Sequence, residues 1–539
     1  MIRDLNQSDS SFAICDAKVC IVGAGTAGIY LAHILCKLGI QVVLLETGNT
    51  LACKPEFSDH ICEQRGLRYR GSDLGRSFGL GGTSVLWGGQ MIPLTESDIG
   101  PRLHIGFEGW PIGYADIAKY FSLVQQEFGL DKYGTSSHLE SARCLQENFP
   151  DLNNFSDDFD LRLSKWLPFK KRNFAKNFAH ELANNDGLTV WLNASVVSMN
   201  SSTQGIDNVI SSIVAQSPNG RKLSVNPSRV VICAGALEST RLLLAFDEAT
   251  DGSITNAGAP LGRYFADHLS LTCGHFVCRD WRRFNLALAP IFNKGVMQTP
   301  RLEIKGLTQQ KLKLTSAFAH FAFVTRGNTG FDIVRNVLRR RQGEKASLGL
   351  NAASLLEVVK DLSAMVFWRI VHRRLLIPRK ADLLFQIDIE QMPNINSRLI
   401  LSEDLDALNR KRLAIDWQIK AEDLQVIHKV AELVRVAWQN SSLREVADLE
   451  LVLPDALDSF ATAYDVYHPT GSIRMGASST NSVVDRDLRV WGTSNCYVSS
   501  TAVFPSAGSA NPGLMHLALT ARLADFLAQS LHIRGVNIP

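Results

Sequence analysis

Two polar side chains near the C-terminal end of the sequence could together act on a hydroxyl group. His468 stands in the segment YHPTGSIRMG, and Asn511 stands in a turn rich in glycine and proline before an apolar helical pattern. An imidazole can accept a hydroxyl proton, and an amide can hold the oxygen while hydride leaves the carbon. The pair therefore fits alcohol oxidation. The alternatives are a structural histidine at His468 and a turn or helix-cap role for Asn511.

A glycine-rich turn near the N-terminus predicts a nucleotide site. The apolar run KVCIV breaks at Gly23, Gly25 and Gly28 and continues as a helical pattern, and Glu46 follows a second apolar run. We expect Gly23 to form the sharp turn, Gly25 to let backbone N–H groups approach a pyrophosphate, and Gly28 to bring helix and strand close together. Glu46 is placed to bind a ribose diol. The motif alone does not distinguish FAD from NAD.

A second glycine cluster, GLGGTSVLWGGQ at residues 79–90, predicts a loop that closely approaches a ligand. Its glycines allow the backbone to come near, and Thr83 and Ser84 offer hydroxyl groups. A flexible surface loop rarely carries Trp87 beside an apolar leucine. We therefore expect this loop to pack over a flat ring system.

Further strand, turn and helix patterns are spread along the whole chain. They occur at residues 228–244 and 495–530, with strand-like alternation at 188–198. A single parallel sheet assembled from such distant pieces predicts a discontinuous cofactor domain, which favours a flavin fold over a compact NAD domain. The segments 314–324 and 381–390 alternate with period two and predict antiparallel strands. The expected class is α/β, with a discontinuous doubly wound, Rossmann-like FAD-binding domain and a substrate domain built on an antiparallel sheet plus helices.

Composition sets the remaining bounds. The 539 residues require more than one domain, and the net charge of +3 gives no reason to expect nucleic acid as a partner. The ten cysteines are scattered and lack paired CxxC motifs, so we expect buried thiols and no metal site. The N-terminus lacks the pattern of a signal peptide, and a cytoplasmic location is expected.

One segment, from Arg335 to Lys380, carries eleven Lys/Arg against three Asp/Glu, interleaved with apolar residues. Such a stretch can lie on an anionic membrane surface, which gives a possible peripheral membrane contact. The alternative, which we favour, is a basic helical insertion over the substrate domain with its apolar stripe facing the core.

Together the motifs resemble the glucose–methanol–choline (GMC) oxidoreductase family over nearly the whole chain, from about residue 18 to residue 530. The resemblance rests on GAGTAG with Glu46, GLGGTSVLWGG, ICAGALESTRLLL, LGRYFADH, HPTGSIRMG and VFPSAGSANPGL, and also on GWPIG and MPNINSR. It implies FAD as the cofactor. It also implies that His468 is the base for a CH–OH group whose hydride passes to flavin N5, with Asn511 orienting the same oxygen.

Two positions depart from the family pattern. Some members bind FAD covalently through a histidine where this chain has Leu86, so we expect non-covalent FAD. Many members carry Asp where this chain has Ser500, which removes a charge near the cofactor. The loop and the final turn are nearer the pyranose-oxidising branch, which suggests a sugar, glycoside or related polyol as substrate. His268 is more consistent with a buried structural role, and His104, His275, His320 and His516 are weaker candidates.

The resulting cofactor set is Gly23, Gly25, Thr26, Ala27, Gly28, Glu46, Thr47, Gly82, Thr83, Ser84, Trp87, Gly88, Gly89, Val196, Ala234, Gly235, Ser500, Ala502, Asn511 and Pro512. The expected domain pieces are 14–113, 186–270 and 456–533 for FAD binding, 114–185 as a substrate-domain or lid segment, and 271–455 as the substrate domain with the basic insertion near 335–380. The electron acceptor is left open among oxygen, a quinone and a protein. Two rival functions are a lyase that keeps FAD as scaffold and a non-catalytic assembly protein on a membrane surface.

Overall fold

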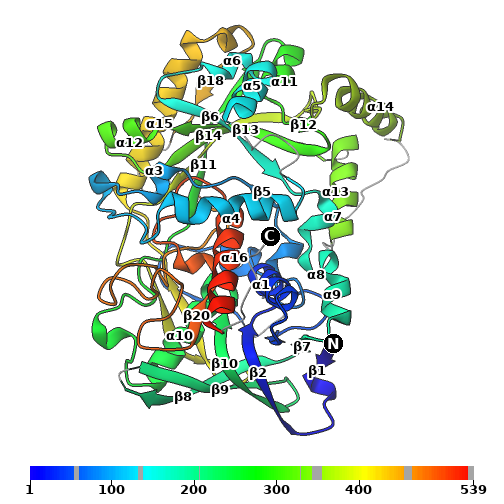
Figure 1. Ribbon diagram of the computed structural model, residues 1–539. Helices are drawn as coiled ribbons and strands as arrows, with labels where there is room; N and C mark the ends of the chain where they lie inside the picture. The colour runs from blue at the N-terminus through cyan, green and yellow to red at the C-terminus, as the bar shows by residue number, and fades with distance from the viewer. Residues whose placement is uncertain are drawn as a thin grey trace.

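The computed structural model describes residues 1–53, 60–130, 138–205, 207–327, 329–342, 355–453 and 464–531. Two large sheets organise this part of the chain, a mainly parallel one in the lower half of Figure 1 and an antiparallel one in the upper half. Each sheet has its own cluster of buried apolar side chains. The predicted α/β class with one parallel and one antiparallel sheet is confirmed.

The parallel sheet joins strands from both ends of the chain. Its order is β1-β7-β3-β2-β10, and β20 pairs with the C-terminal part of β10 while the antiparallel pair β9 and β8 continues from the N-terminal part. Residues 19–22 of β2 are apolar without a break because both faces of the sheet are covered there. The strands are β1 Ile2–Asp4, β2 Phe12–Val22, β3 Val42–Leu45, β7 Leu188–Leu192, β8 Ser195–Gln204, β9 Asp207–Gln216, β10 Lys222–Ile232 and β20 Cys496–Val498.

Three helices begin just after strands of this sheet. α1 (Thr26–Lys37) follows β2, α10 (Gly235–Ala249) follows β10, and α16 (Gly513–Ser530) follows β20 after a turn. α16 packs against both α1 and α4 (Tyr114–Glu127). Helix N-termini carry partial positive charge, so the edge of the sheet at which they meet favours anionic ligands.

The antiparallel sheet has the order β18-β11-β15-β14-β13-β6-β5, with β12 and β19 attached at β13 and β11. The predicted strands near 314–324 and 381–390 are its members β14 and β15. The helix α15 (Ala421–Asn440) packs against it. The strands are β5 Gln90–Met91, β6 Phe159–Trp166, β11 His268–Cys278, β12 Ile291–Asn293, β13 Val296–Ile304, β14 Ala317–Val324, β15 Asp382–Glu390, β18 Ala447–Leu451 and β19 Tyr464–Asp465.

A small third sheet, β4 with β16 and β17, packs against α10. Its strands are β4 Glu63–Gln64, β16 Arg398–Leu405 and β17 Lys411–Asp416. The remaining α-helices are α2 Gly71–Leu74, α3 Glu96–Ile99, α5 His138–Asn148, α6 Pro150–Asn153, α7 Phe169–Arg172, α8 Phe174–Asn177, α9 Ala179–Asn184, α11 Trp281–Leu288, α12 Gly306–Leu312, α13 Gly330–Gln342 and α14 Leu355–Phe367.

The segment 114–185, predicted as one substrate-domain or lid piece, is divided between the two units. Its strand β6 pairs with β13 and β5 in the antiparallel sheet. Its helices α4, α8 and α9 instead pack against α16, α1 and β7 of the parallel-sheet unit. The hydrophobic pattern of these helices marks a buried face but does not say which sheet it faces, so the predicted boundary was wrong here.

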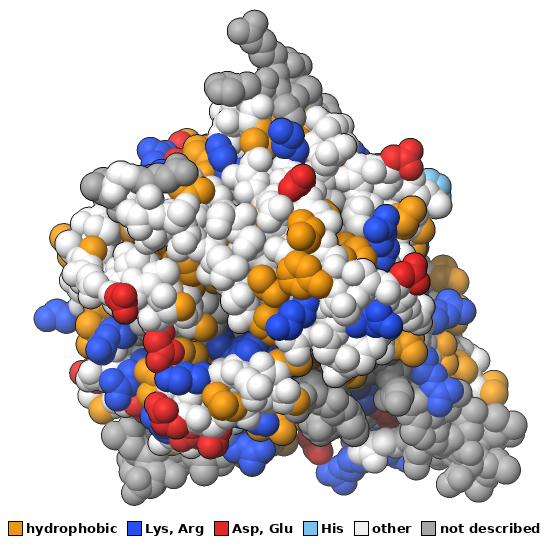
Figure 2. Space-filling view, turned by 90° about the horizontal axis from the view of Figure 1, so that it is seen from below, with side chains coloured by type: hydrophobic (Ala, Val, Ile, Leu, Met, Phe, Trp, Pro, Cys, Tyr) orange, Lys and Arg blue, Asp and Glu red, His pale blue; other side chains and the backbone are white. Residues whose placement is uncertain are grey.

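The basic segment near 335–380 is helical, as predicted, over α13, α14 and a π-helical turn at Trp368–His372; residues 343–354 lie outside the described residues. α13 packs against α14 and against α7. Within the described chain no helix combines the length and apolar character needed to cross a membrane. On the face drawn in Figure 2, basic and acidic side chains are interspersed among the coloured residues, as the small net charge leads one to expect.

Candidate active site

A cavity of about 720 Å³ lies where the three helix N-termini approach the antiparallel sheet. Its wall runs from the glycine turn at Gly23 to the side chains of His468 and Asn511, and it includes Asp388 of β15. Elements from both units therefore form one continuous pocket. The size and elongated lining fit a nucleotide-containing cofactor with room for a small substrate at one end.

The glycine turn has the close backbone packing that its motif predicts. Gly23 has a φ of 103°, and a Cβ atom there would lie 2.7 Å from the carbonyl oxygen of Cys233. A Cβ on Gly28 would lie only 1.9 Å from the carbonyl oxygen of Gly23. Gly28 therefore does not line the pocket but sets the contact between α1 and the turn. Gly25 is different, because a Cβ there would meet no atom of the described residues within 4 Å.

Glu46 lies buried beside this turn. Its carboxylate accepts hydrogen bonds from the backbone N–H groups of Ala24 (2.8 Å), Gly48 (3.0 Å) and Gly79 (2.8 Å). Burial raises its pKa, and the three N–H groups oppose that effect. The carboxylate thus links the first glycine motif to the start of the second glycine loop, on the pocket wall.

The second glycine loop folds against the first. A Cβ on Gly82 would lie 2.8 Å from the Cα atom of Gly25. The Nε1 atom of Trp87 donates to the carbonyl oxygen of Arg172 at 2.8 Å, which holds the indole in the pocket wall. Leu86 lines the same wall. The loop is thus fixed by packing and lines the pocket, and its packing over a flat ring system stays a prediction.

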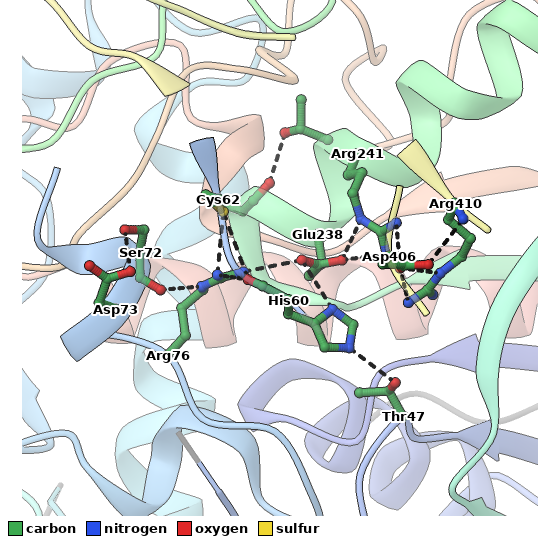
Figure 3. A network of polar contacts seen from close by, with 12 residues as sticks. Thr47, His60, Cys62, Ser72, Asp73, Arg76, Glu238, Arg241, Asp406 and Arg410 are labelled. Carbon is green, nitrogen blue, oxygen red and sulfur yellow. Dashed lines mark hydrogen bonds and ion pairs between the residues drawn. The ribbon is translucent and has the colours of Figure 1, made fainter. Parts of the chain in front are cut away.

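A buried network of ions at the other side of the pocket was not predicted (Figure 3). Glu238 of α10 forms ion pairs with Arg76 (3.1 Å) and Arg241 (2.7 Å), and the Nδ1 atom of His60 lies 3.4 Å from its carboxylate. Arg241 and Arg76 hold the pKa of Glu238 well below its usual range although burial opposes them. Arg410 also borders the pocket and pairs with Asp406 at 2.7 Å. The only signal in the sequence was the i, i+3 spacing of Glu238 and Arg241.

His468 also lines the pocket and is held by its backbone and by its ring. Its backbone N–H donates to the carboxylate of Asp267 at 2.8 Å. The same carboxylate accepts from the hydroxyl of Tyr69 at 2.7 Å. Its Nδ1 lies 3.0 Å from the Nδ1 of His268, with the two rings perpendicular. Burial, and then the neighbouring His268, lower the pKa of His468 to about 3. The imidazole is therefore neutral and can act as a base.

Asn511 lines the same pocket. The guanidinium of Arg301 donates to the Oδ1 of Asn511 at 3.2 Å and also to the carbonyl oxygen of Ser509. Arg301 is fully buried, lies over the ring of Phe318 at 3.3 Å, and has its pKa lowered to about 10 by burial. Because arginine only donates, the NH₂ group of Asn511 stays available as a donor.

Most of the predicted cofactor residues line this one pocket. Those that do are Gly23, Gly25, Thr26, Ala27, Glu46, Thr47, Gly82, Thr83, Trp87, Gly88, Gly89, Val196, Ala234, Gly235, Asn511 and Pro512.

Besides Gly28, three predicted residues lie behind the wall. Ser84 donates to the carbonyl oxygen of Gly81 and accepts from the N–H of Phe174, Ser500 accepts from the N–H of Ala502, and Ala502 is itself fully buried. None of the three is in the pocket wall, and their predicted contact with the cofactor stays a prediction. Thr501 lines the pocket instead.

The histidines rated as weaker candidates have different positions. His516 lines the pocket, and its pKa is lowered to about 4 by burial. His320 lies 3.3 Å from the carboxylate of Asp388. The Nε2 atom of His275 lies 3.0 Å from the carboxylate of Glu450, and His104 contacts the carbonyl oxygen of Leu314. No cluster of potential metal ligands occurs among the described residues.

The pocket fits FAD by its own features. Glycine backbones form a cradle that side chains would fill, three helix N-termini converge on it, and a buried carboxylate stands beside the turn. Residues 16–69 match the family described as FAD binding domain, and residues 393–520 match the family described as GMC oxidoreductase. The parallel FAD-binding sheet and the antiparallel substrate-domain sheet together define an FAD-dependent flavoprotein fold. The segment 393–520 is thus similar to the GMC oxidoreductase family.

Curated relatives match over short segments. "Dehydrogenase str4" from Strobilurus tenacellus is 35% identical over 80 residues, 14% of this chain and 13% of that protein. The GMC oxidoreductase family protein Mala s 12 from Malassezia sympodialis is 30% identical over 113 residues, 20% of this chain and 18% of that protein. The aligned segments thus span less than a fifth of these relatives.

Solved structures match over nearly the full length. Pyridoxine 4-oxidase from Mesorbium loti has a TM-score of 0.58 at 16% identity, covering 95% of this chain and 99% of that one. Formate oxidase from Aspergillus oryzae has a TM-score of 0.56 at 13% identity, covering 96% and 98%. At these identities the likeness shows the shared fold.

Proposed function

We propose that the protein oxidises a CH–OH group to a carbonyl with FAD as cofactor. The observation that carries this proposal is that the neutral imidazole of His468 and the amide of Asn511 line one pocket together with the two glycine motifs. When bound, FAD supplies the acceptor for the hydride. His468 accepts the hydroxyl proton, and the NH₂ group of Asn511 donates to the same oxygen as negative charge develops on it.

For the substrate we propose a sugar, a glycoside or a related polyol. The reaction end of the pocket has aromatic surface from Trp166 and Tyr467 and polar groups from Gln90 and Asp388. Such a mixture suits a compact ring with several hydroxyl groups. Because one similar structure is named a pyridoxine oxidase, pyridoxine belongs among the alcohols to be tested.

Anaerobic reduction of the bound flavin tests the proposal. We expect one or more compounds from a panel of sugars, glycosides, primary alcohols and pyridoxine to bleach the flavin absorbance, and His468→Ala to slow bleaching on the order of 10²–10⁴-fold with flavin still bound. Absence of bleaching by every compound would favour a lyase that keeps FAD as scaffold. Reoxidation by oxygen, a quinone or a protein then identifies the electron acceptor.

We propose that FAD is held without a covalent bond. The residue of the glycine loop that corresponds to the attachment histidine of some relatives is Leu86, which lines the pocket and has no nucleophilic atom. Denaturation should therefore release all the yellow colour into the filtrate. Colour that stays on the precipitated chain would contradict this proposal.

We also propose contact with an anionic membrane surface through α14 and the turn that follows it. Val366, Phe367, Ile370 and Val371 are each more than half exposed, and their spacing of four residues puts them on one side of the helical path. Arg373 is an exposed cation beside this apolar stripe. An exposed apolar stripe with a cation next to it in the chain suits an anionic headgroup layer. The favoured expectation of a core-facing stripe was wrong for these four residues.

We propose a reducing, cytoplasmic location because the cysteines are not paired in disulfides. All ten lie within the described residues and are free thiols.

A further inference from the structure

A chain of hydrogen bonds connects His468 to the turn that carries Asn511. The Nε2 atom of His268 lies 2.7 Å from the carbonyl oxygen of Gly508, and its Nδ1 atom lies 3.0 Å from the Nδ1 of His468. His268 is only 2% exposed and does not reach the pocket. Its ring therefore stands behind His468, between that residue and the final turn.

The chemistry of the three groups decides where the protons lie. A carbonyl oxygen can only accept, so the Nε2 of His268 must carry a proton. Burial lowers the pKa of both His268 and His468, so each ring is neutral and has a single N–H. The Nδ1 of His268 is then an acceptor, and the Nδ1 of His468 must donate to it. The proton of His468 is thus on Nδ1, and its Nε2 carries a lone pair.

The surroundings of the two rings agree with this assignment. Among the hydrogen bonds of the described residues, the side chain of His468 is bonded through Nδ1, and the ring itself borders the pocket. The carboxylate of Asp267 accepts hydrogen bonds from the backbone N–H of His468 and from the hydroxyl of Tyr69. The carboxylate of Asp388 lies 3.3 Å from His320, and its charge raises the pKa of both His268 and His468, but burial outweighs that effect.

We propose that His268 is a positioning residue that fixes the tautomer of His468, so that Nε2 is the atom that accepts the substrate's proton. The inference rests on the proposed alcohol oxidation, which needs an unprotonated nitrogen facing the hydroxyl. Without His268, either nitrogen of His468 can carry the proton, and the wrong tautomer cannot act as base. A wrongly held tautomer in a comparable histidine system costs on the order of 10⁴-fold in rate.

The same turn also holds Asn511 so that its NH₂ group can donate a hydrogen bond, whereas His468 is set to accept a proton. Arg301 donates to Oδ1 of Asn511 and to the carbonyl oxygen of Ser509, one residue after the carbonyl that orients His268. One catalytic side chain is thereby set to accept and the other to donate. Because Gly508 has a φ of 56°, its left-handed conformation belongs to the geometry that aims its carbonyl at His268.

Two substitutions of similar size separate this role from a merely structural one. His268→Gln keeps an acceptor for His468 and a donor for Gly508, whereas His268→Leu removes both. ¹⁵N NMR of histidine-labelled holoprotein reads the tautomer directly, with His468 assigned by comparison with His468→Asn. We expect Nδ1–H in the wild type and in His268→Gln, and loss of that state in His268→Leu.

Flavin reduction is measured on the same samples. We expect His268→Gln to remain within about tenfold of the wild type and His268→Leu to fall by about 10² or more. An Nε2–H tautomer in the wild type, or an unchanged tautomer and rate in His268→Leu, would overturn the inference. If no alcohol bleaches the wild type, the proposed oxidation fails, but the NMR result still decides the role of His268. If His268→Leu does not fold, the wild-type tautomer and His268→Gln remain decisive.

Discussion

The environment of His468 predicts an unusual pH dependence. Burial places its pKa near 3, so lowering the pH protonates the base only far below the ordinary range of histidine. We expect the rate of anaerobic flavin reduction to be independent of pH between about 5 and 8, where an ordinary histidine would lose its base form below about 6.5. Stopped-flow reduction across this range checks the prediction, and a limb with a midpoint near 6.5 would contradict it.

At the residue scale, the sequence revealed the reacting side chains better than their supports. His468 and Asn511 could be found because both occur in turns of tightly specified composition. Arg301 could not, because a charged residue within a strand has no local mark of burial, and its partner is contributed by a distant turn. His268 was assigned a structural role since its neighbour in space, His468, is far away in sequence.

At the element scale, Gly25 and Gly28 form a matched pair for testing the first turn. A Cβ at Gly28 would overlap the carbonyl oxygen of Gly23, whereas one at Gly25 would enter open space on the pocket side. We expect Gly28→Ala to lower the free energy of unfolding by about 1–3 kcal/mol or more, as overpacking does. Gly25→Ala should fold normally but bind FAD at least about tenfold more weakly.

Urea unfolding of the apoprotein and titration with FAD measure the two quantities separately. If Gly25→Ala and Gly28→Ala lowered the free energy of unfolding equally, the assignment of Gly28 to packing and of Gly25 to the ligand would be wrong.

The exposed stripe of α14 gives a second prediction at this scale. We expect the wild-type protein to float with phosphatidylserine vesicles and not with phosphatidylcholine vesicles, and the double substitution Phe367→Ser/Ile370→Ser to abolish flotation. Leu307→Ser removes an apolar residue that is 80% exposed elsewhere and serves as the control. Flotation that survives the double substitution would exclude this stripe as the contact.

The order and type of most elements followed from the sequence. The glycine turns, the final helix and the period-two strands each have a local pattern with a physical cause. The partner of an amphipathic helix does not, which is why α4 was assigned to the wrong unit. The ion network around Glu238 was missed for a similar reason, since its cations come from separate segments that only the fold brings together.

At the scale of the whole molecule, a buried ion pair joins the two units. Arg102 follows α3 and forms a two-pronged contact with Glu390 of β15, with Nη1–Oε2 at 2.5 Å and Nη2–Oε1 at 3.0 Å. The side chains are only 4% and 6% exposed. We expect Arg102→Met to lower the free energy of unfolding by about 3–5 kcal/mol, because Glu390 is left as an uncompensated buried charge.

The double substitution Arg102→Met/Glu390→Met should recover most of that loss, because neither charge remains buried alone. Urea unfolding followed by tryptophan fluorescence provides the comparison. A double variant as unstable as the sum of the single ones would show that the two charges do not interact across the units.

The parallel sheet also determines when, during synthesis, the cofactor-binding unit can finish folding. Strand β2 near the start of the chain pairs with β10, and β10 pairs with β20 close to residue 500. During synthesis, the chain up to α16, which ends at Ser530, must leave the ribosome before this edge can close and α16 can dock. Contacts between such distant segments form slowly. The pocket is therefore complete only after β20 and α16 have emerged, and a nascent chain exposes apolar strands until then.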